Sequence, residues 1–258
     1  MGKVIAICNQ KGGTGKTTTA INLSVYLALQ NKKTVLIDLD PQGNSTTGLG
    51  LDKNLLQQSS YEVLLKTIDI SGSLTKSYVD NLQLVPANIN LIGAEFDLIN
   101  EPDREQRLKS AIESIRQNFD FIVIDSPPSL GLLTLNALVA ADSVIVPVQC
   151  EYFALEGLGQ LIKTINLVKS QFNPNLEIQG VLLTMADFRT NLTAEVIRET
   201  RSFFKDKVFQ TIIPRSIKLS EAPGFGKPIA LYDHSSIGAV KYDALAKELL
   251  GELPADDF

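Results

Sequence analysis

The stretch Asn9-Gln10-Lys11-Gly12-Gly13-Thr14-Gly15-Lys16-Thr17-Thr18 lies between two apolar segments near the start of the chain. Residues 3–8 are apolar and β-branched and predict a buried strand, whereas residues 19–29 are apolar at helical spacing. A strand, a glycine-rich loop and a helix in this order favour phosphate binding, because glycines let successive backbone N–H groups converge on an anion at the helix N-terminus. In such a loop Lys16 reaches the β- and γ-phosphates, and the Thr17 hydroxyl ligates Mg²⁺.

This loop departs from the general pattern at its start. Gln10 stands six positions before Lys16, where a glycine is usual, and Lys11 adds a second lysine. A triphosphate ligand would explain a second lysine beside Lys16, because both cations could offset its negative charge. A degenerate loop with a lysine on the surface is the alternative interpretation.

Bulk composition narrows the class of protein. A chain of 258 residues suits one large α/β domain covering residues 1–258. No apolar run approaches the roughly 18 residues of a membrane span, and no signal peptide is expected before the first strand. Cys8 and Cys150 end apolar runs and are expected to be buried free thiols of a reduced cytosol. His234 has no paired ligand or nucleophile nearby in sequence, so we expect it on the surface.

Charge is unevenly distributed. The net charge of −5 does not indicate nucleic-acid binding, but residues 187–227 carry eight basic and five acidic residues and are net +3. An ordinary solvated face explains this window as well as a binding surface does. From Lys241 onward there are two lysines and five acids, a sign opposite to that of an amphipathic membrane anchor.

Two further apolar segments end in acids. Residues 34–40 close in Asp38 and Asp40 before a Pro-Gln-Gly-Asn turn, and residues 119–125 close in Asp125. Ligands of open α/β sheets bind at the carboxyl ends of the strands, so these acids should face the phosphates. Asp40 is the candidate to orient an attacking water, and Asp125 to hold Mg²⁺ through its water shell. Asp38 either lies near the metal, behind the groups that bind it directly, or is a hydrogen-bonding residue at a strand end.

The remaining pattern alternates strands with helices. We expect a doubly wound, mostly parallel sheet with helices on both faces, as in P-loop NTPases. The last helix should face the core with Ile237, Val240 and Leu245. The expected strands cover residues 81–86, 142–148, 179–185 and 210–215, and the expected helices cover residues 61–67, 102–118, 154–171, 192–204 and 236–250.

Several blocks together resemble the ParA/Soj family of deviant Walker A ATPases, which segregate chromosomes and plasmids. The glycine loop alone would also fit MinD and the nitrogenase iron protein, whereas the blocks after residue 150 are typical of the Soj type. The resemblance covers residues 11–17, 38–44, 125–128, 151–157, 185, 189–192, 213–215 and 221–223, and so nearly the whole chain. Thr14 stands where valine is common in the family, and it is small enough to be tolerated.

The resemblance implies an ATP-dependent sandwich dimer with Mg²⁺ and ATP or ADP as ligands. Lys11 would reach the phosphates of the partner subunit, and Gly12 would lie at the dimer seam. Lys16 and Asp40 would act with Lys11 in catalysis, and Thr17, Asp125 and Asp38 would lie on the metal side. The implied ATP-binding residues are Lys11, Gly12, Gly13, Thr14, Gly15, Lys16, Thr17, Thr18, Glu151, Met185, Pro214 and Arg215, with Met185 and Pro214 near the adenine and Glu151 near the partner's nucleotide.

The resemblance also implies partners. The ATP dimer would bind double-stranded DNA non-specifically through Arg189 and Lys218, and a ParB/Spo0J-type protein would stimulate a slow ATPase. The expected location is the cytoplasm, on the nucleoid and not on a membrane. No helix-turn-helix extension precedes the loop, so operator binding is not expected.

Three alternatives stay open. A MinD-like membrane ATPase is disfavoured by the acidic tail. An iron–sulfur reductase would need cysteines within residues 125–131, and that stretch has none. A small-molecule ATP-dependent synthase on the same fold would not respond to DNA or to a ParB-type partner.

Overall fold

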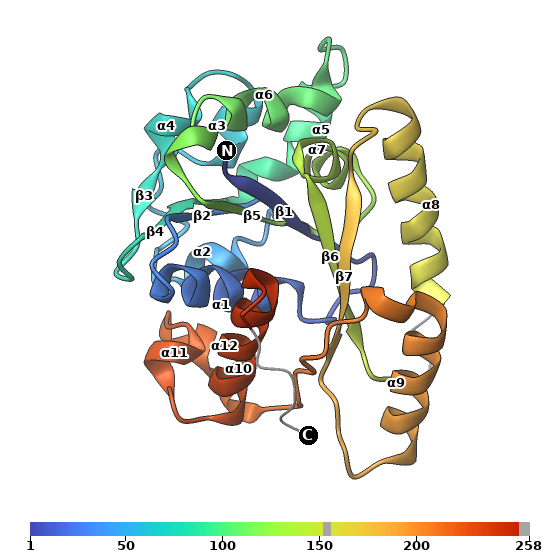
Figure 1. The fold of residues 1–258 in the computed structure, drawn as a ribbon. Coiled ribbons are helices and arrows are strands. Elements are labelled where there is room, and N and C mark those ends of the chain that lie inside the picture. The colour runs from blue at the N-terminus through green and yellow to red at the C-terminus, as the bar shows by residue number, and fades with distance from the viewer. Residues whose placement is uncertain (152–155, 253–258) are drawn as a thin grey trace.

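A seven-stranded sheet runs through the residues that the computed structural model describes, 1–151 and 156–252 (Figure 1). Its strand order is β3-β4-β2-β5-β1-β6-β7, and every neighbouring pair is parallel except β3 with β4. The strands are β1 (Lys3–Ile7), β2 (Thr34–Asp38), β3 (Thr75–Lys76), β4 (Leu82–Val85), β5 (Phe121–Asp125), β6 (Ser143–Gln149) and β7 (Glu177–Thr184). The predicted doubly wound fold class is confirmed.

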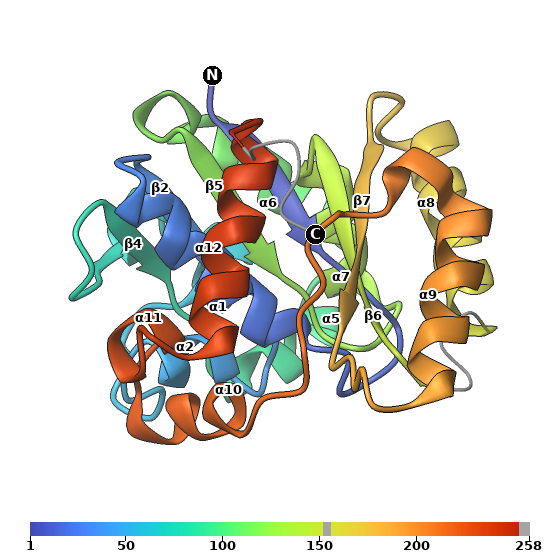
Figure 2. The same cartoon turned by 60° about the horizontal axis from the view of Figure 1, so that its bottom comes forward.

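Helices cover both faces of the sheet (Figures 1 and 2). One face carries α1 (Lys16–Leu29), α10 (Ile217–Glu221), α11 (Ile229–Tyr232) and α12 (Ile237–Leu250). The other carries α3 (Ser60–Leu64), α4 (Ile70–Ser73), α5 (Ala94–Asp97), α6 (Arg107–Glu113), α7 (Leu132–Ala140), α8 (Glu156–Gln171) and α9 (Asn191–Phe204). The short α2 (Asn44–Gly48) follows β2, and single 3₁₀ turns are η1 (Ile89–Ile92), η2 (Arg104–Gln106), η3 (Arg116–Asn118), η4 (Lys205–Lys207) and η5 (Ala222–Phe225).

The alternation of side chains along each strand divides the core into two layers. On β1 and just beyond it, Val4, Ala6 and Cys8 pack against the layer of α6 and α7, whereas Ile5 and Ile7 pack against α1 and α12. Because successive strand residues point to opposite faces, a central strand buried on both faces must be apolar throughout. The parallel strands thus end together at one edge, where β1, β2 and β5 place the glycine loop and the acids.

Two expected elements differ in the structure, and one observed helix was not expected. The helix expected over 102–118 is broken, because the Asn136 side chain of α7 accepts from Leu108 N–H and donates to the Arg104 carbonyl. These two backbone groups would bond each other in a continuous helix. Residues 210–215 form no strand, and only an isolated bridge joins Pro214 to Ala186. Helix α7 was not predicted, because it is apolar on all sides and shows no amphipathic period.

The last helix buries Leu245 as expected, but it does not bury Ile237 and Val240. Ile237 and Val240 are 51% and 53% exposed, while Tyr242 and Leu245 are buried. Tyr242 reaches α1, where its hydroxyl lies 3.1 Å from the Thr19 hydroxyl. The pairing of this helix with α1 therefore decided its orientation.

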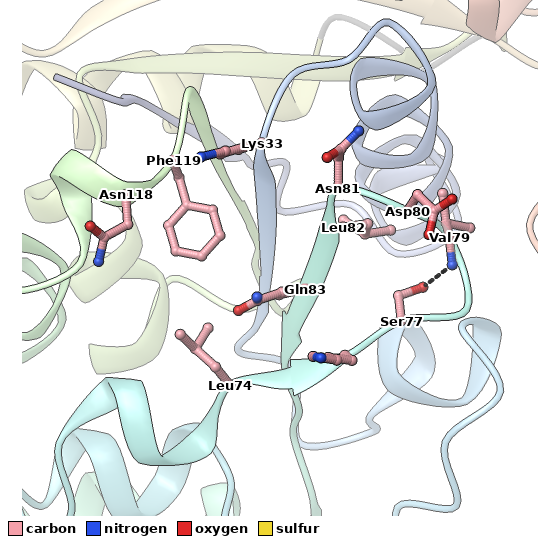
Figure 3. A pocket seen from close by; sticks show the side chains of 11 residues that line it. Lys33, Leu74, Ser77, Val79, Asp80, Asn81, Leu82, Gln83, Asn118 and Phe119 are labelled. Atoms are coloured by element: carbon pink, nitrogen blue, oxygen red, sulfur yellow. Dashed lines mark hydrogen bonds between the residues drawn. The ribbon is translucent and has the colours of Figure 1, made fainter.

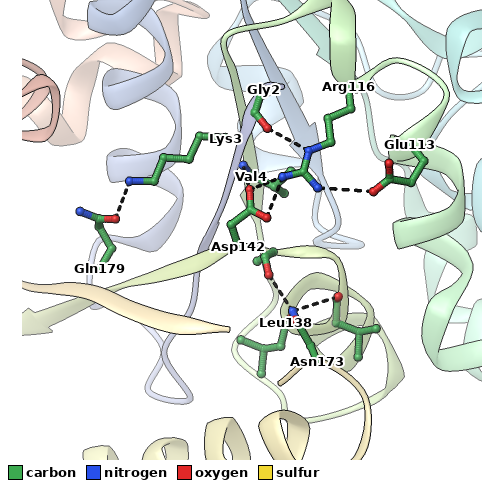
Figure 4. A network of polar contacts seen from close by, with 11 residues as sticks. Gly2, Lys3, Val4, Glu113, Arg116, Leu138, Asp142, Asn173 and Gln179 are labelled. Carbon is green, nitrogen blue, oxygen red and sulfur yellow. Dashed lines mark hydrogen bonds and ion pairs between the residues drawn. The ribbon is translucent and has the colours of Figure 1, made fainter. Parts of the chain in front are cut away.

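A polar network ties the amino ends of the strands together (Figure 4). The Arg116 guanidinium donates to both Asp142 carboxylate oxygens at 2.7 and 2.6 Å and to the Gly2 carbonyl at 3.0 Å. Asp142 also accepts from Val4 N–H, and Asn173 donates to the carbonyls of Leu138, Val139 and Ala141 at the end of α7. The network fixes the edge of the sheet opposite to the glycine loop.

Asn173→Ala should lower the free energy of unfolding by about 1–3 kcal/mol, because it leaves buried carbonyls of the α7 end without a donor. Asn173 is 7% exposed. Urea unfolding measures the change, with Asn175→Ala, an exposed neighbour, as the control expected within about 0.5 kcal/mol of the parent. Equal stability of the two variants would contradict this role.

Candidate functional site

The glycine loop between β1 and α1 has the backbone of an anion-binding turn. Gly13 and Gly15 have φ angles of 74° and 88°, in the left-handed region that favours glycine. Gly15 caps the N-terminus of α1, whose first residues are Lys16 and Thr17. Backbone N–H groups and the positive end of the helix therefore face the same point.

Two side chains from neighbouring strands hold this loop, and sequence reasoning assigned a role to neither. The Asn9 amide donates to the Pro147 carbonyl on β6 at 2.6 Å and accepts from Lys11 N–H. The Thr184 hydroxyl at the end of β7 donates to the Thr14 carbonyl at 2.8 Å. Only the tertiary contact with β6 and β7 reveals these two supports.

The Lys16 side chain is 6% exposed and lies inside the loop. Its ammonium donates to the Lys11 carbonyl at 3.1 Å. Burial lowers the pKa of Lys16, and the charge of Asp125 opposes that shift. A buried ammonium surrounded by N–H groups is arranged to compensate a phosphate.

The acids that end β2 and β5 lie side by side. Asp38 and Asp125 are paired across the two strands, and both are fully buried. Burial raises the pKa of Asp38 to about 6 and that of Asp125 to about 8. Asp38 accepts from Thr46 N–H, from the Thr46 hydroxyl and from Asp40 N–H, so its oxygens are taken by hydrogen bonds.

Asp125 retains an unused oxygen. Its Oδ2 accepts from the Ser45 hydroxyl at 2.8 Å, whereas its buried Oδ1 has no hydrogen-bond partner among the described residues. Asp125 lies close to the Thr17 hydroxyl. The unsatisfied carboxylate oxygen and the hydroxyl are both oxygen donors, which Mg²⁺ prefers. Within residues 1–151 and 156–252 there is no cluster of three or more His, Cys, Asp or Glu residues able to hold a metal ion by themselves. The arrangement fits an ion held largely by phosphate and water.

A pocket of about 360 Å³ opens in front of the loop. Its lining includes Lys16, Thr17, Asp40, Asn44, Pro128 and Met185. Asp40 is 7% exposed, and its Oδ1 accepts from Gln42 N–H at 2.9 Å. The structure thus brings Asp40 to the same cavity as the glycine loop, while Asp38 lies behind it.

Of the candidate residues after position 150, Met185 lines this pocket, whereas Glu151, Pro214 and Arg215 are not among its lining residues. Met185 has a φ of 52°, and Pro214 pairs with the next residue, Ala186. Glu151 lies 3.8 Å from the ammonium of this chain's own Lys11 and 3.5 Å from the Arg215 guanidinium. Glu151 therefore forms ion pairs with both cations in the single chain.

Arg189 and Lys218 do not line the nucleotide pocket. The Arg189 guanidinium donates two hydrogen bonds to Asp187, which lower the pKa of that carboxyl to about 2. Lys218 on α10 lies 3.4 Å from Glu221. Both basic side chains are exposed on the surface of the protein but paired.

A larger pocket, of about 570 Å³, lies at the opposite edge of the sheet (Figure 3). Lys33, Gln83 and Phe119 line it, and Asp80 is its one carboxylate. No glycine loop and no pair of acids faces this pocket. The chemistry of the lining, and not the volume, therefore identifies the smaller pocket as the functional site.

The remaining expectations concern thiols, the histidine and membranes. Cys8 and Cys150 are buried free thiols, and burial raises their pKa to about 12 and about 11. Neither lies near residues 125–131 in sequence, and His234 is exposed as expected.

Among the described helices none has the length and apolar character needed to cross a bilayer.

The buried acid pair predicts a pH dependence of stability in the metal-free and nucleotide-free protein. The folded state holds protons on Asp38 and Asp125 that the unfolded chain, with ordinary carboxyl pKa values near 3.8, has already lost. The free energy of unfolding should therefore fall as the pH rises from about 4 to about 8. Asp125→Asn should flatten this slope in urea titrations with EDTA, and the exposed Asp80→Asn should not; equal slopes would exclude the acid pair as its origin.

Comparison with known proteins is consistent with this geometry. A family model described as an AAA domain matches residues 2–178. The sporulation initiation inhibitor protein Soj of Bacillus subtilis (strain 168) is 55% identical over 96% of this chain and 98% of its own. The chromosome-partitioning ATPase Soj of Treponema pallidum (strain Nichols) is 51% identical over 97% of this chain and 98% of its own.

Solved structures share the fold along the whole chain. One described as cobyrinic acid a,c-diamide synthase of Mycobacterium smegmatis, with a bound ATP analogue and magnesium, has a TM-score of 0.86 at 39% identity and covers 97% of this chain and 95% of its own. The cell division ATPase MinD of Pyrococcus furiosus has a TM-score of 0.78 at 26% identity, over 97% of this chain and 99% of its own. The full-length identity to curated Soj proteins decides among these relatives: the chain belongs to the ParA/Soj family of partitioning ATPases.

Proposed function

We propose that this ATPase, with ATP and Mg²⁺ bound, forms a sandwich dimer that binds DNA without sequence preference. Hydrolysis, stimulated by a ParB/Spo0J-type partner, would release the dimer from DNA and so drive chromosome or plasmid segregation. The proposed location is the cytoplasm, on the nucleoid. Residues 1–258 would act as one ATPase domain.

The surroundings of Gly12 are the main support for the proposed dimer. Gly12 is exposed, has no left-handed φ, and a Cβ built on it would meet no atom of the described residues within 4 Å. Within the part of the chain that the structure describes, nothing therefore requires glycine at this position. A second chain packed against the loop would require it, and the neighbouring Lys11, 40% exposed, could then reach the nucleotide of the partner subunit.

Within one subunit the residues divide the work of hydrolysis. Lys16 and the loop N–H groups would bind the β- and γ-phosphates, and Thr17 and Asp125 would hold Mg²⁺. Bound Mg²⁺ supplies positive charge that offsets the charge of the phosphates. Asp40, at the pocket wall, would orient the attacking water, while Lys11 from the partner would stabilise the charge that develops on the γ-phosphate.

DNA binding would use Arg189 and Lys218. Both are exposed basic side chains within the net-positive window of residues 187–227. Non-specific DNA affinity grows with the number of phosphates that are neutralised, so joining two chains converts two weak surfaces into one bivalent surface. ATP would thereby control DNA binding through the dimer.

Two other functions remain distinguishable by experiment. The 39% identity to the protein described as a synthase favours a small-molecule synthase as the second candidate, and its turnover would not respond to DNA or a ParB-type partner. A MinD-like function predicts sedimentation with liposomes in the presence of ATP. Strong liposome binding would overturn the proposal.

Gly12→Val should keep the fold and ATP binding of the single chain but prevent the dimer, since the side chain meets open space in one subunit and the partner in two. Asp40→Ala should have the opposite effect on the dimer. It should bind ATP but fail to hydrolyse it, so the ATP-bound dimer should persist. Light scattering coupled to size exclusion measures the mass with ATP. A Gly12→Val protein that dimerises as the parent does would contradict the seam, and rapid turnover by Asp40→Ala would contradict the role of that acid.

Arg189→Glu should weaken DNA binding by roughly 10-fold or more at low salt, because it removes one phosphate contact per chain and introduces repulsion. The ATP-dependent dimer should persist, because Arg189 lies outside the nucleotide pocket. Fluorescence anisotropy with a labelled duplex measures affinity, and light scattering on the same sample checks the dimer. Unchanged affinity at low salt would remove Arg189 from the DNA surface.

A further inference from the structure

Each cation proposed to contact DNA is already engaged by a nearby acid of its own chain. The Arg189 guanidinium meets Asp187 in a two-pronged contact, with Nε 2.8 Å from Oδ1 and Nη2 2.7 Å from Oδ2. Asp187 Oδ1 also accepts from the backbone N–H of Arg189 at 3.1 Å, which fixes the carboxylate in place. Although Arg189 is 86% exposed, one edge of its guanidinium is therefore occupied.

Lys218 has the same relation to Glu221. Its ammonium lies 3.4 Å from Glu221 Oε2, and the Tyr232 hydroxyl donates to that same oxygen at 3.0 Å. The ammonium also lies 5.5 Å from the centroid of the Tyr232 ring. Glu221 is thus held beside the cation by a tyrosine from α11, and not by the ion pair alone.

We infer that Asp187 and Glu221 are internal counter-ions that keep the DNA affinity of a single chain low. This inference rests on the proposed DNA binding and adds the residues that regulate it. A DNA phosphate must compete with a carboxylate that is already in hydrogen-bond contact, and the displaced carboxylate then repels the phosphate. Each pair is neutral as a unit, so one chain releases few counter-ions from DNA.

The consequence is a threshold for binding. When two chains act together, their four cations engage one duplex, and the cost of displacing each acid is met by a bivalent contact. The acids would therefore increase the difference in DNA affinity between the single chain and the dimer. Exposed ion pairs of this kind contribute little to folding stability, so their removal should leave the fold intact.

The test compares Asp187→Asn, Glu221→Gln and the double variant with the parent, in full-length protein without nucleotide, with ADP and with ATP. Asparagine and glutamine keep the oxygen that accepts from Arg189 N–H or the Tyr232 hydroxyl, so only charge is removed. Glu195→Gln is the matched control, because Glu195 is an exposed acid on α9 with no ion pair among the described residues. Anisotropy of a labelled random-sequence duplex is measured across a salt series.

Each of the two single variants should bind DNA about threefold more tightly without nucleotide at low salt, and the slope of log affinity against log salt should steepen by up to about 0.9. The double variant should show both gains, and Glu195→Gln should stay within about twofold of the parent. If the variants match Glu195→Gln while the parent binds DNA with ATP, the inference is wrong and the proposed function stands. If the parent does not bind DNA with ATP at any salt concentration, both are wrong.

Discussion

The site depends on two carboxylates that cannot reach water, Asp38 and Asp125, placed side by side at the ends of neighbouring strands. Buried charge of one sign is costly unless hydrogen bonds or opposite charge offset it. Thr46 donates two hydrogen bonds to Asp38, and the positive charge of the Lys16 ammonium interacts with the charge of Asp125. Among the residues that the structure describes, one oxygen of Asp125 has no hydrogen-bond partner, and a bound cation would remove this deficit. Electrostatic compensation thus couples the glycine loop to the acids.

The loop owes its shape to residues far from it in sequence. Asn9 ties its start to β6, and Thr184 ties its middle to β7. The same strand β7 leads into Met185 at the pocket wall and then to the paired Arg189. One short segment of chain after β7 therefore connects Met185 at the pocket wall with Arg189 of the proposed DNA surface.

In the single chain, the basic side chains proposed to act in the dimer or on DNA form ion pairs with acids of the same chain. Lys11 and Arg215 both turn to Glu151, and Arg189 turns to Asp187. Each basic side chain that the proposed dimer or DNA would use has an acidic partner in the isolated chain. Because exposed pairs are weak, they are exchanged readily for phosphate, which is a stronger and multiply charged acceptor. The surface charge is thus organised for replacement by ligands.

Local sequence determined the glycine loop, the acid-ended strands and the doubly wound fold, because backbone freedom of glycine and strand and helix periodicity are properties of neighbouring residues. Tertiary structure alone decided the rest. The Asn136 amide interrupts the helix expected over 102–118, and contact with α1 buries Tyr242 where Ile237 and Val240 were expected. Likewise the supports at Asn9 and Thr184, and the acids beside Arg189 and Lys218, join side chains through folded geometry. Such contacts depend on where strands and helices meet in space, which no local pattern specifies.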